Sequence, residues 1–417
     1  MSDWDVVIAG AGPAGSTAAA LLADAGCRVL VLEKAHFPRF HVGESLLPSG
    51  LAVLDRLGIE ATPETHVFKR GAEFVCETTD RSACFDFADA LPGPARHAWH
   101  VERAAFDTML RDRAVSAGAT VRHGVAVHDF EAGSNGVRVS TDNGVASARY
   151  VLDATGQARL VARREKAVVP YRNFGRAAVF AHYHGIGPDA WREIGPGADI
   201  RIMVVDDGWA WVIPLPGDRL SIGRVSRRGG IRRAHLDDYV NGSPMLSRWT
   251  AGCPRSEIHL VSNFSFRNDA AFGQRYACVG DAACFLDPVF SSGVALAMTG
   301  AERVVDRLLP ALTDGRESDP QLMRPVDAHM QRGYAIFAAL IDRFYNTRFI
   351  DNLIFGVPID DTFGPAITSV LAGDVWRPDN RFTRMLERSR RRMADGPRRI
   401  ETSPPSTPEP AARRVST

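Results

Sequence analysis

The sequence predicts an α/β protein in which a Rossmann-like domain is interrupted by a mainly antiparallel sheet. An apolar run at 5–9 precedes a glycine-rich turn, an alanine-rich stretch and a second apolar run at 28–32, which is the order of a βαβ unit. Residues 166–267 alternate short strand-like runs with Gly and Pro. A short apolar strand at 276–279 then leads into a long apolar helix. We therefore expect a discontinuous α/β domain with an inserted sheet.

Size and composition favour a soluble protein that works on small molecules. The 417 residues are 45% apolar, enough for a large core and two or three domains. Because 50 basic and 49 acidic residues nearly balance, no nucleic-acid partner or anionic membrane is expected. No leader-like start and no apolar run of roughly 18 residues is present, which predicts a cytoplasmic location. Six cysteines without CxxC spacing predict neither a metal site nor disulfides.

The first turn carries the pattern of a dinucleotide site. Gly10 allows the tight turn, Gly12 lets the backbone approach a pyrophosphate, and Gly15 allows close helix packing. Glu33 ends the second strand, where a carboxylate accepts a ribose hydroxyl. A lone GxGxxG is weak evidence, but here the strand, helix, second strand and acid all have the expected spacing. The predicted site also takes in the adjacent Ala14 and Lys34.

A polar loop at 37–48 follows, and it contains several candidate cofactor ligands in a glycine-containing turn. These are Arg39, Gly43, Glu44 and Ser45, together with Arg103 at the start of a helix predicted over 103–117. An alternative is that the acid and the serine only cap the helix expected over 46–57.

The stretch 278–298 predicts an anion or cofactor cradle. An apolar strand ends at Gly280 and Asp281, and Ser291, Ser292 and Gly293 stand at the head of an apolar helix. Helix starts present unpaired N–H groups and the positive end of the helix dipole, both of which attract anions. The alternative is an ordinary capped core helix.

Two further features are ambiguous by themselves. Trp209 and Trp211 alternate on one face of a predicted strand, which usually means core packing. Lys69 precedes Gly71 by two residues and could be a plain surface lysine, although only three of the 50 basic residues are lysines. Because the protein otherwise uses arginine for positive charge, each lysine is more informative.

Together these motifs resemble the flavin-dependent halogenases, a family within the para-hydroxybenzoate hydroxylase-like flavoproteins. The resemblance spans about residues 3 to 350 and includes the FAD fingerprint described above. His66 stands where the family's FxxKxG has its first Phe, which weakens that match but keeps the amine. The matching segments are Trp209-x-Trp211-x-Ile213-Pro214 (WxWxIP), Phe285-x-x-Pro288-x-x-Ser291-x-Gly293 (FxxPxxSxG) and Lys69-x-Gly71 (the end of FxxKxG).

The resemblance implies FAD, used as FADH2, as the cofactor, with Glu33 at the adenosine ribose and Asp281 at the ribityl or pyrophosphate region. Pro288 and Gly293 would lie beside the flavin. A flavin hydroperoxide formed with O2 would oxidise chloride or bromide held at Ser292 and Gly293, giving hypohalous acid. That acid would reach Lys69 and halogenate an electron-rich aromatic ring, a step that suits a compact amine with a tunable pKa. Trp209 and Trp211 would screen the substrate from the flavin, and Phe290 and Ser291 would contribute to the same pocket.

One departure from the family pattern bears on the substrate. Tryptophan halogenases carry a glutamate directly before the motif serine, and Phe290 occupies that place before Ser291. The DPVFSSG form resembles halogenases of phenols and pyrroles, many of which act on rings tethered to carrier proteins. Free tryptophan is therefore not the expected substrate.

Alternative functions remain open at this level. The nearest is an aromatic hydroxylase, but the turn Asp153-Ala154-Thr155-Gly156 lacks the Asp-Gly doublet of those enzymes. A single GxGxxG without a nicotinamide domain favours FADH2 supplied by a separate flavin reductase. A saturating reductase of the geranylgeranyl reductase type, or a flavin-binding sensor, would leave Lys69 without a clear role.

The predicted domains follow from these assignments. The FAD-binding domain is expected at 1–75, 98–165 and 268–320, the substrate-side sheet at 76–97 and 166–267, a helical segment at 321–393 and a disordered tail at 394–417.

Overall fold

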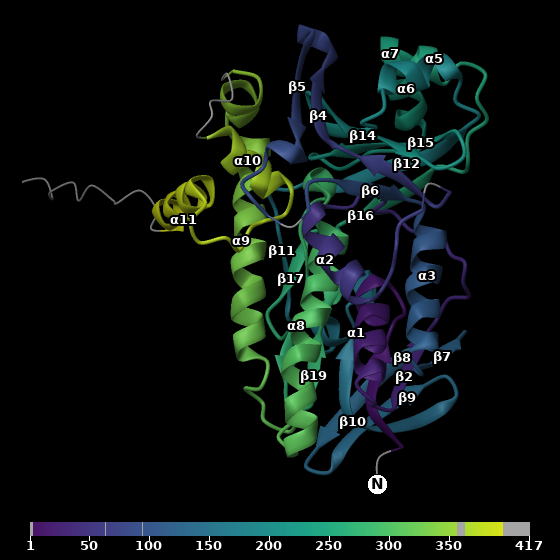
Figure 1. Ribbon diagram of the computed structural model, residues 1–417, viewed down its shortest axis with the longest axis vertical. Coiled ribbons are helices and arrows are strands. Elements are labelled where there is room, and N and C mark those ends of the chain that lie inside the picture. The colour runs from purple at the N-terminus through teal and green to yellow at the C-terminus, as the bar shows by residue number, and fades with distance from the viewer. Residues whose placement is uncertain (1–2, 63, 94, 357–362, 395–417) are drawn as a thin grey trace, which may run out of the picture.

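The computed structural model describes residues 3–62, 64–93, 95–356 and 363–394, and all structural statements below concern these residues. The tail predicted from 394 onward therefore lies almost entirely outside them. Figure 1 shows one sheet in the lower half of the molecule, a second sheet in the upper half, and two long helices along the side.

The lower sheet is the predicted α/β sheet. Its strands are β1 (Trp4–Ala9), β2 (Val29–Glu33), β7 (Thr120–His123), β8 (Val127–Gly133), β9 (Gly136–Thr141), β10 (Gly144–Asp153), β18 (Phe272–Gly273) and β19 (Tyr276–Cys278). The main order is β18-β19-β10-β1-β2-β7, and β19, β10, β1, β2 and β7 run parallel. The carboxyl ends of β1, β2, β10 and β19 therefore share one edge, which is where ligands bind in such sheets.

Helices α1 (Pro13–Asp24), α3 (Arg103–Ser116) and α8 (Ser292–Asp314) pack together on one face of this sheet. The first of these is buried along nearly its whole length, from Pro13 to Ala23, which explains its small alanine-rich side chains. Because β19 and α8 return from far along the chain, the domain is discontinuous, as predicted.

The upper sheet is mainly antiparallel, also as predicted. Its order is β16-β12-β15-β14-β13-β4-β5, and only β13 and β4 run parallel. The strands are β4 (Gly71–Cys76), β5 (Arg81–Asp86), β12 (Ala177–His184), β13 (Ile200–Val205), β14 (Gly208–Leu215), β15 (Arg219–Ser226) and β16 (His259–Ser262). This sheet thus includes Gly71 to Cys76, a segment assigned almost wholly to the FAD-binding domain from the sequence.

The two faces of the upper sheet have different roles. Along β14, Trp209, Trp211 and Ile213 point to the large core shared with the lower half. Ala210 and Val212 point the other way, into a smaller core. That outer core is covered by α5 (Pro188–Ile194), α6 (Ala234–Gly242) and α7 (Pro244–Trp249), which lie at the top of Figure 1.

Two small sheets connect the halves. β3 (His66–Lys69) pairs with β6 (Ala98–Val101) in antiparallel register, with Lys69 opposite Ala98. The other sheet joins β11 (Val168–Pro170), β17 (Phe266–Asn268) and β20 (Cys284–Phe285). Two short helices contact the lower half: α2 (Pro48–Arg56) packs against α8, and α4 (Leu160–Arg164) packs against β8.

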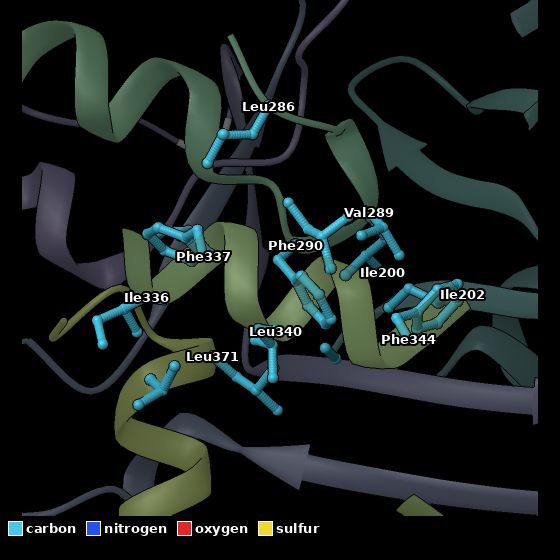
Figure 2. Close-up of a cluster of buried hydrophobic side chains, with 14 of the residues drawn as sticks. Ile200, Ile202, Leu286, Val289, Phe290, Ile336, Phe337, Leu340, Phe344 and Leu371 are labelled. Carbon is cyan, nitrogen blue, oxygen red and sulfur yellow. The ribbon is translucent and has the colours of Figure 1, made fainter. Parts of the chain in front are cut away.

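The C-terminal part is helical, as predicted. It comprises α9 (Arg324–Asn346), a π-helical turn (Ile350–Ile354), α10 (Gly364–Leu371) and α11 (Arg381–Ala394). α9 runs beside α8 and supplies Ile336, Phe337, Leu340 and Phe344 to the large core (Figures 1 and 2). Across the described ranges, no helix is both long enough and apolar enough to span a membrane.

Candidate active site

A cavity of about 540 Å³ lies where the carboxyl ends of the lower strands meet the inner face of the upper sheet. The cofactor residues predicted from the sequence all line it, except Gly15. They are Gly10, Gly12, Ala14, Glu33, Lys34, Arg39, Gly43, Glu44, Ser45, Arg103, Gly280, Asp281, Pro288 and Gly293. Segments that are far apart in the sequence therefore form one site.

The glycines of the first turn have distinct structural reasons. Gly10 has φ +103°, and a side chain there would overlap the carbonyl of Ala154. A Cβ on Gly15 would overlap the carbonyl of Gly10, so this glycine allows α1 to pack closely. A Cβ on Gly12 would come only within 3.5 Å of Arg39, an ordinary contact. Packing therefore does not require Gly12, and the space beside it belongs to the cavity.

Glu33 lies at the end of β2 and is buried. Its two carboxylate oxygens accept hydrogen bonds from the backbone N–H groups of Ala11 (2.8 Å) and Ala35 (2.9 Å). Each oxygen retains a free lone pair for a hydroxyl donor. The carboxylate is thus fixed at the cavity wall in an orientation suited to a ribose.

The polar loop before α2 is held by Arg103 and lines the same cavity. Arg103 forms a two-point ion pair with the buried Asp107 (2.8 and 3.1 Å) and donates to the carbonyl of Val42. Glu44 hydrogen-bonds to His182 of β12 at 2.6 Å, which ties the loop to the upper sheet. The buried hydroxyl of Ser45 has no hydrogen-bond partner in the part of the chain that the structure describes. A buried orphan donor at a cavity wall indicates a ligand partner.

Asp281 follows β19 and faces Gln157, whose side-chain amide donates to it at 3.1 Å. Burial raises the pKa of Asp281 to about 6, and the hydrogen bond from Gln157 partly offsets this rise. A carboxyl with a pKa near 6 changes protonation state over a small interval of pH. It can therefore either accept a hydrogen bond from a ligand hydroxyl or donate one to it.

These observations fit an FAD. The parallel strand edge, the open side of Gly12, the fixed Glu33 and the orphan hydroxyl of Ser45 are the groups that a dinucleotide with a ribityl chain requires. The same cavity is lined by Asp281 and by the Trp pair of the upper sheet.

Of the predicted halide segment, Ser291 and Gly293 line the cavity, whereas Ser292 does not. Ser291 precedes α8 in the left-handed conformation (φ +55°), which is strained for a residue with a side chain. No side chain caps the helix, so the N–H groups of its first turn remain available. Ser292 is buried, and Gly293 lines the cavity with only an ordinary contact at its Cβ position.

A hydrogen-bond chain joins this segment to the Trp pair and to α9. The indole N–H of Trp209 donates to the hydroxyl of Tyr345 (2.8 Å), which donates to the buried carboxyl of Asp287 (2.9 Å). Asp287 also accepts from the backbone N–H groups of Gly175 and Val289. Burial raises the pKa of Asp287 to about 6. Trp209 and Trp211 line the cavity, with ring centres 5.7 Å apart.

Contrary to the expectation that it contributes to the pocket, Phe290 does not line this cavity but belongs to the apolar core. Figure 2 shows its ring among Val289, Leu340 and Phe344, and it meets the ring of Phe344 edge-on at 5.9 Å. An ionised side chain at this position would lose its hydration without gaining a partner from these apolar groups. Phe290 therefore suits its surroundings as an apolar residue.

Lys69 ends β3 and is 1% exposed, so the surface-lysine alternative is wrong. Its ammonium donates to the backbone carbonyl of Leu46 (2.9 Å) and lies 5.1 Å from the ring centre of Phe87. Burial lowers the pKa of Lys69 to about 7, and the charge of Asp199 opposes part of that fall. An amine with a pKa near 7 is present in both protonation states at neutral pH.

Several residues of this region were not predicted. His182, Gln157 and Tyr345 carry hydrogen bonds to predicted site residues, yet they lie on β12, after β10 and on α9, with no local motif. The only available signal was the acidic-glycine turn at 153–156, since Thr155 and Gly156 line the cavity.

The fold and the cavity together define an FAD-dependent flavoprotein, and comparison with protein families agrees. Residues 3–171 match the FAD-binding domain family. Residues 90–353, more than half of the chain, match the tryptophan halogenase family. The chain therefore belongs to the family of flavin-dependent halogenases.

Individual relatives agree with this assignment. A flavin-dependent halogenase of Penicillium aethiopicum is 30% identical over 71% of this chain and 62% of its own length. The 1H-pyrrole-2-carbonyl-[peptidyl-carrier protein] chlorinase of Pseudomonas fluorescens is 29% identical over 90% of both proteins. The chain spans 60% to 65% of the length of three curated relatives that it matches, the Penicillium aethiopicum halogenase among them.

Solved structures share the fold. The myxobacterial chondrochloren halogenase is 29% identical, with a TM-score of 0.74 over 91% of this chain and 92% of that one. A flavoprotein/dehydrogenase from Cytophaga hutchinsonii is 26% identical, with a TM-score of 0.81 over 94% of this chain and 99% of that one. Because both proteins have this fold, the reaction must be argued from the site residues.

Proposed function

We propose that this protein is an FADH2-dependent halogenase that chlorinates or brominates an electron-rich aromatic ring, a phenol or a pyrrole. The observation that carries the proposal is Lys69, a buried amine in contact with the loop that lines the FAD cavity. A merely structural lysine gains nothing from such burial, because removing a charge from water costs free energy unless it is repaid. A buried amine with a pKa near 7 can act as both acid and base in electrophilic halogen transfer.

The reaction is divided between the cavity and Lys69, which does not line the cavity but contacts the loop that does. Reduced FAD, when bound, supplies the oxidising chemistry by which O2 and halide give hypohalous acid. The first turn of α8, at Ser292 and Gly293, offers its free N–H groups to the halide. Trp209 and Trp211 occupy the wall between the cavity and the large core, where their rings keep the aromatic substrate away from the flavin.

Lys69 performs the transfer. The ring carbon forms a bond to the halogen while the halogen–oxygen bond breaks, and its electron pair moves to oxygen. The Lys69 ammonium donates a proton to that oxygen and water leaves. The neutral amine then takes the proton that the ring carbon loses, which restores the ammonium. A pKa near 7 suits both proton transfers, because neither protonation state is strongly favoured at neutral pH.

The substrate proposal rests on Phe290 and on the Pseudomonas fluorescens relative. With Phe290 before Ser291, the motif lacks the glutamate of tryptophan halogenases, and the side chain at this position packs in the apolar core rather than lining the cavity. The relative whose name specifies a pyrrolyl group on a peptidyl carrier protein aligns over 90% of both chains. We infer a carrier-tethered pyrrole or phenol as the substrate and a separate flavin reductase as the source of FADH2, both in the cytoplasm.

The test uses full-length protein with a flavin reductase, O2 and either chloride or bromide, against free and carrier-bound phenols and pyrroles. Mass spectrometry should detect products that gain one or more halogens, with chlorine or bromine isotope patterns that follow the halide supplied. A hydroxylated product that forms equally well without halide would instead identify an aromatic hydroxylase.

A further inference from the structure

The strongest unexplained feature beside the proposed site is the imidazole of His100. This residue lies on β6 and is 0% exposed. Its Nε2 is 2.8 Å from the backbone carbonyl of Ala198, whereas its Nδ1 has no hydrogen-bond partner among the described residues. Because a carbonyl can only accept, Nε2 carries the proton, and Nδ1 of the neutral ring is an unused acceptor. Burial lowers the pKa of His100 to about 3, so the ring stays neutral at physiological pH.

The strand pairing places this acceptor next to Lys69. Lys69 lies opposite Ala98 in the antiparallel pair of β3 and β6. His100 is two residues further along β6, so its side chain is on the same face, in the diagonal position. Diagonal neighbours are about 7 to 8 Å apart, within reach of long side chains. The positive charge of Lys69 also contributes to the lowered pKa of His100.

The cavity loop connects the two side chains. Ser45 forms an isolated bridge with His100, and the next carbonyl along the loop, that of Leu46, accepts the hydrogen bond from Lys69. The two nitrogens, Nζ of Lys69 and Nδ1 of His100, are thus buried on one strand face and do not bond to each other. A donor and an acceptor in this arrangement can bind a small molecule that has both functions.

The acidic groups around Lys69 are the other candidates for the acceptor beside its amine. Asp199, next to Ala198, is the acidic group that acts on Lys69; its Oδ2 accepts from two guanidinium nitrogens of Arg70, whereas its buried Oδ1 has no hydrogen-bond partner among the described residues and is a second, charged acceptor in this region. Phe290 removes the carboxylate that tryptophan halogenases have in the motif. Within the described part of the chain, His100 offers a neutral acceptor on the strand face that carries the amine.

We propose that Lys69 and His100 form a two-point site for hypohalous acid. The Lys69 ammonium donates a hydrogen bond to the oxygen of the acid, and the O–H of the acid donates to Nδ1 of His100. With oxygen and hydrogen both held, the halogen is the end left free to face the aromatic ring. The inference rests on the proposed function, since it assigns a binding partner to the oxidant in that reaction.

Three substitutions separate this role from a structural one. His100→Asn places an amide oxygen where Nδ1 lies but loses the bond to Ala198. His100→Leu has nearly the shape of Asn without the acceptor. His100→Gln extends an amide N–H toward the carbonyl of Ala198 and lacks the acceptor at Nδ1. FAD content and melting temperature of each variant report whether it folds and loads normally.

The informative readout is how the oxidant partitions in each variant. With substrate, halide and reductase present, the halogenated product per FADH2 oxidised is compared with halogen captured by a freely diffusing scavenger such as taurine. We expect His100→Asn to stay within about twofold of the wild type. His100→Leu and His100→Gln should lose about tenfold in product with a matching rise in scavenger halogenation, the effect of one lost hydrogen bond. Equal partition in all three variants would overturn the proposal, as would a defect in Asn and Leu but not in Gln.

A cofactor-free measurement distinguishes this inference from the proposed function. FAD-free protein is treated with substoichiometric hypochlorite, and chlorination of Lys69 is quantified by peptide mass spectrometry. The neutral amine attacks chlorine, the chlorine–oxygen bond breaks with its electron pair going to oxygen, and the amine proton completes water. Because the two-point site holds the oxygen at the Lys69 nitrogen and turns the chlorine away from it, the chlorinated fraction should be about tenfold lower in His100→Asn than in His100→Leu. An equal fraction would contradict the two-point site, whereas a wild type without any halogenated product would contradict only the proposed function.

Discussion

The buried charge of Lys69 predicts a measurable conflict between stability and function. A fall in the pKa of Lys69 from 10.5 to about 7 corresponds to about 5 kcal/mol of destabilisation when the folded protein carries the ammonium. Lys69→Met removes this cost, but it leaves the carbonyl of Leu46 without its donor, which costs about 1 to 3 kcal/mol. We therefore expect the variant to be more stable than the wild type by about 2 to 4 kcal/mol below pH 7.

The stability difference between Lys69→Met and the wild type should depend on pH in a direction set by the pKa shift of Lys69. The folded-state pKa of Lys69 is lowered, so between about 7 and 10.5 the unfolded chain binds more protons than the folded one, and wild-type stability rises with pH in this window. The advantage of Lys69→Met should be full below pH 7 and decrease as the pH approaches 10.5. The free energy of unfolding from urea titrations between about pH 6 and about pH 10 measures it.

Lys166→Met is the matched control, because Lys166 is exposed and changing it should leave stability nearly constant at every pH. A Lys69→Met variant that is less stable than the wild type throughout, or whose advantage does not change with pH, would refute the reasoning.

Three other predictions address the cofactor cavity and its supports. Gly15→Ala should prevent folding because its Cβ overlaps Gly10, whereas Gly12→Ala should melt like the wild type yet lose FAD absorbance at 450 nm at least tenfold, since only the ligand needs that space. Equal FAD content in Gly12→Ala would contradict the placement of the pyrophosphate. Tyr345→Phe should lower the free energy of unfolding by about 1 to 3 kcal/mol and raise the halide KM more than it changes kcat, because Asp287 loses a donor beside the halide segment. Asp281→Asn should stabilise the FAD-free protein by up to about 3 kcal/mol above pH 6 and not at about pH 3.5, because the raised folded-state pKa makes wild-type stability fall as the pH rises from 3.8 to about 6. Urea titrations at both pH values check this, and an equal effect at both would contradict it.

The fold was largely predictable because its signals are local. The glycines of the first turn and Glu33 sit within one βαβ unit, where spacing along the chain translates directly into distance at one sheet edge. The inserted sheet was predictable from alternation, since Trp209 and Trp211 share a strand face. These patterns depend on backbone geometry, which the sequence specifies over a few residues.

The site was only partly predictable because its supports come from distant segments. Tyr345 stands on a helix that follows all the motifs, and its aromatic ring gave no hint that its hydroxyl would join Trp209 to Asp287. Lys69 was predicted as the transfer residue from its resemblance to FxxKxG, but its burial follows from packing between β6, the loop at Leu46 and Phe87. Such packing becomes visible only when the chain is folded.

The role of His100 illustrates the same limit. In the sequence it is one residue of HVERAAFD and precedes a predicted cofactor ligand, Arg103. Its significance depends on the register that places it diagonally from Lys69 and on the Ala198 carbonyl that fixes its tautomer. Neither the register nor the tautomer has a sequence signal.

The measurement that tests the central claim most directly is product analysis of Lys69→Ala beside the wild type and Lys166→Ala. FADH2 and O2 consumption, FAD content and product mass are recorded in one reaction with halide and an accepted aromatic substrate. We predict that Lys69→Ala binds FAD and consumes FADH2 and O2 but forms no halogenated product, while Lys166→Ala matches the wild type. Halogenation by Lys69→Ala at the wild-type rate would contradict the account.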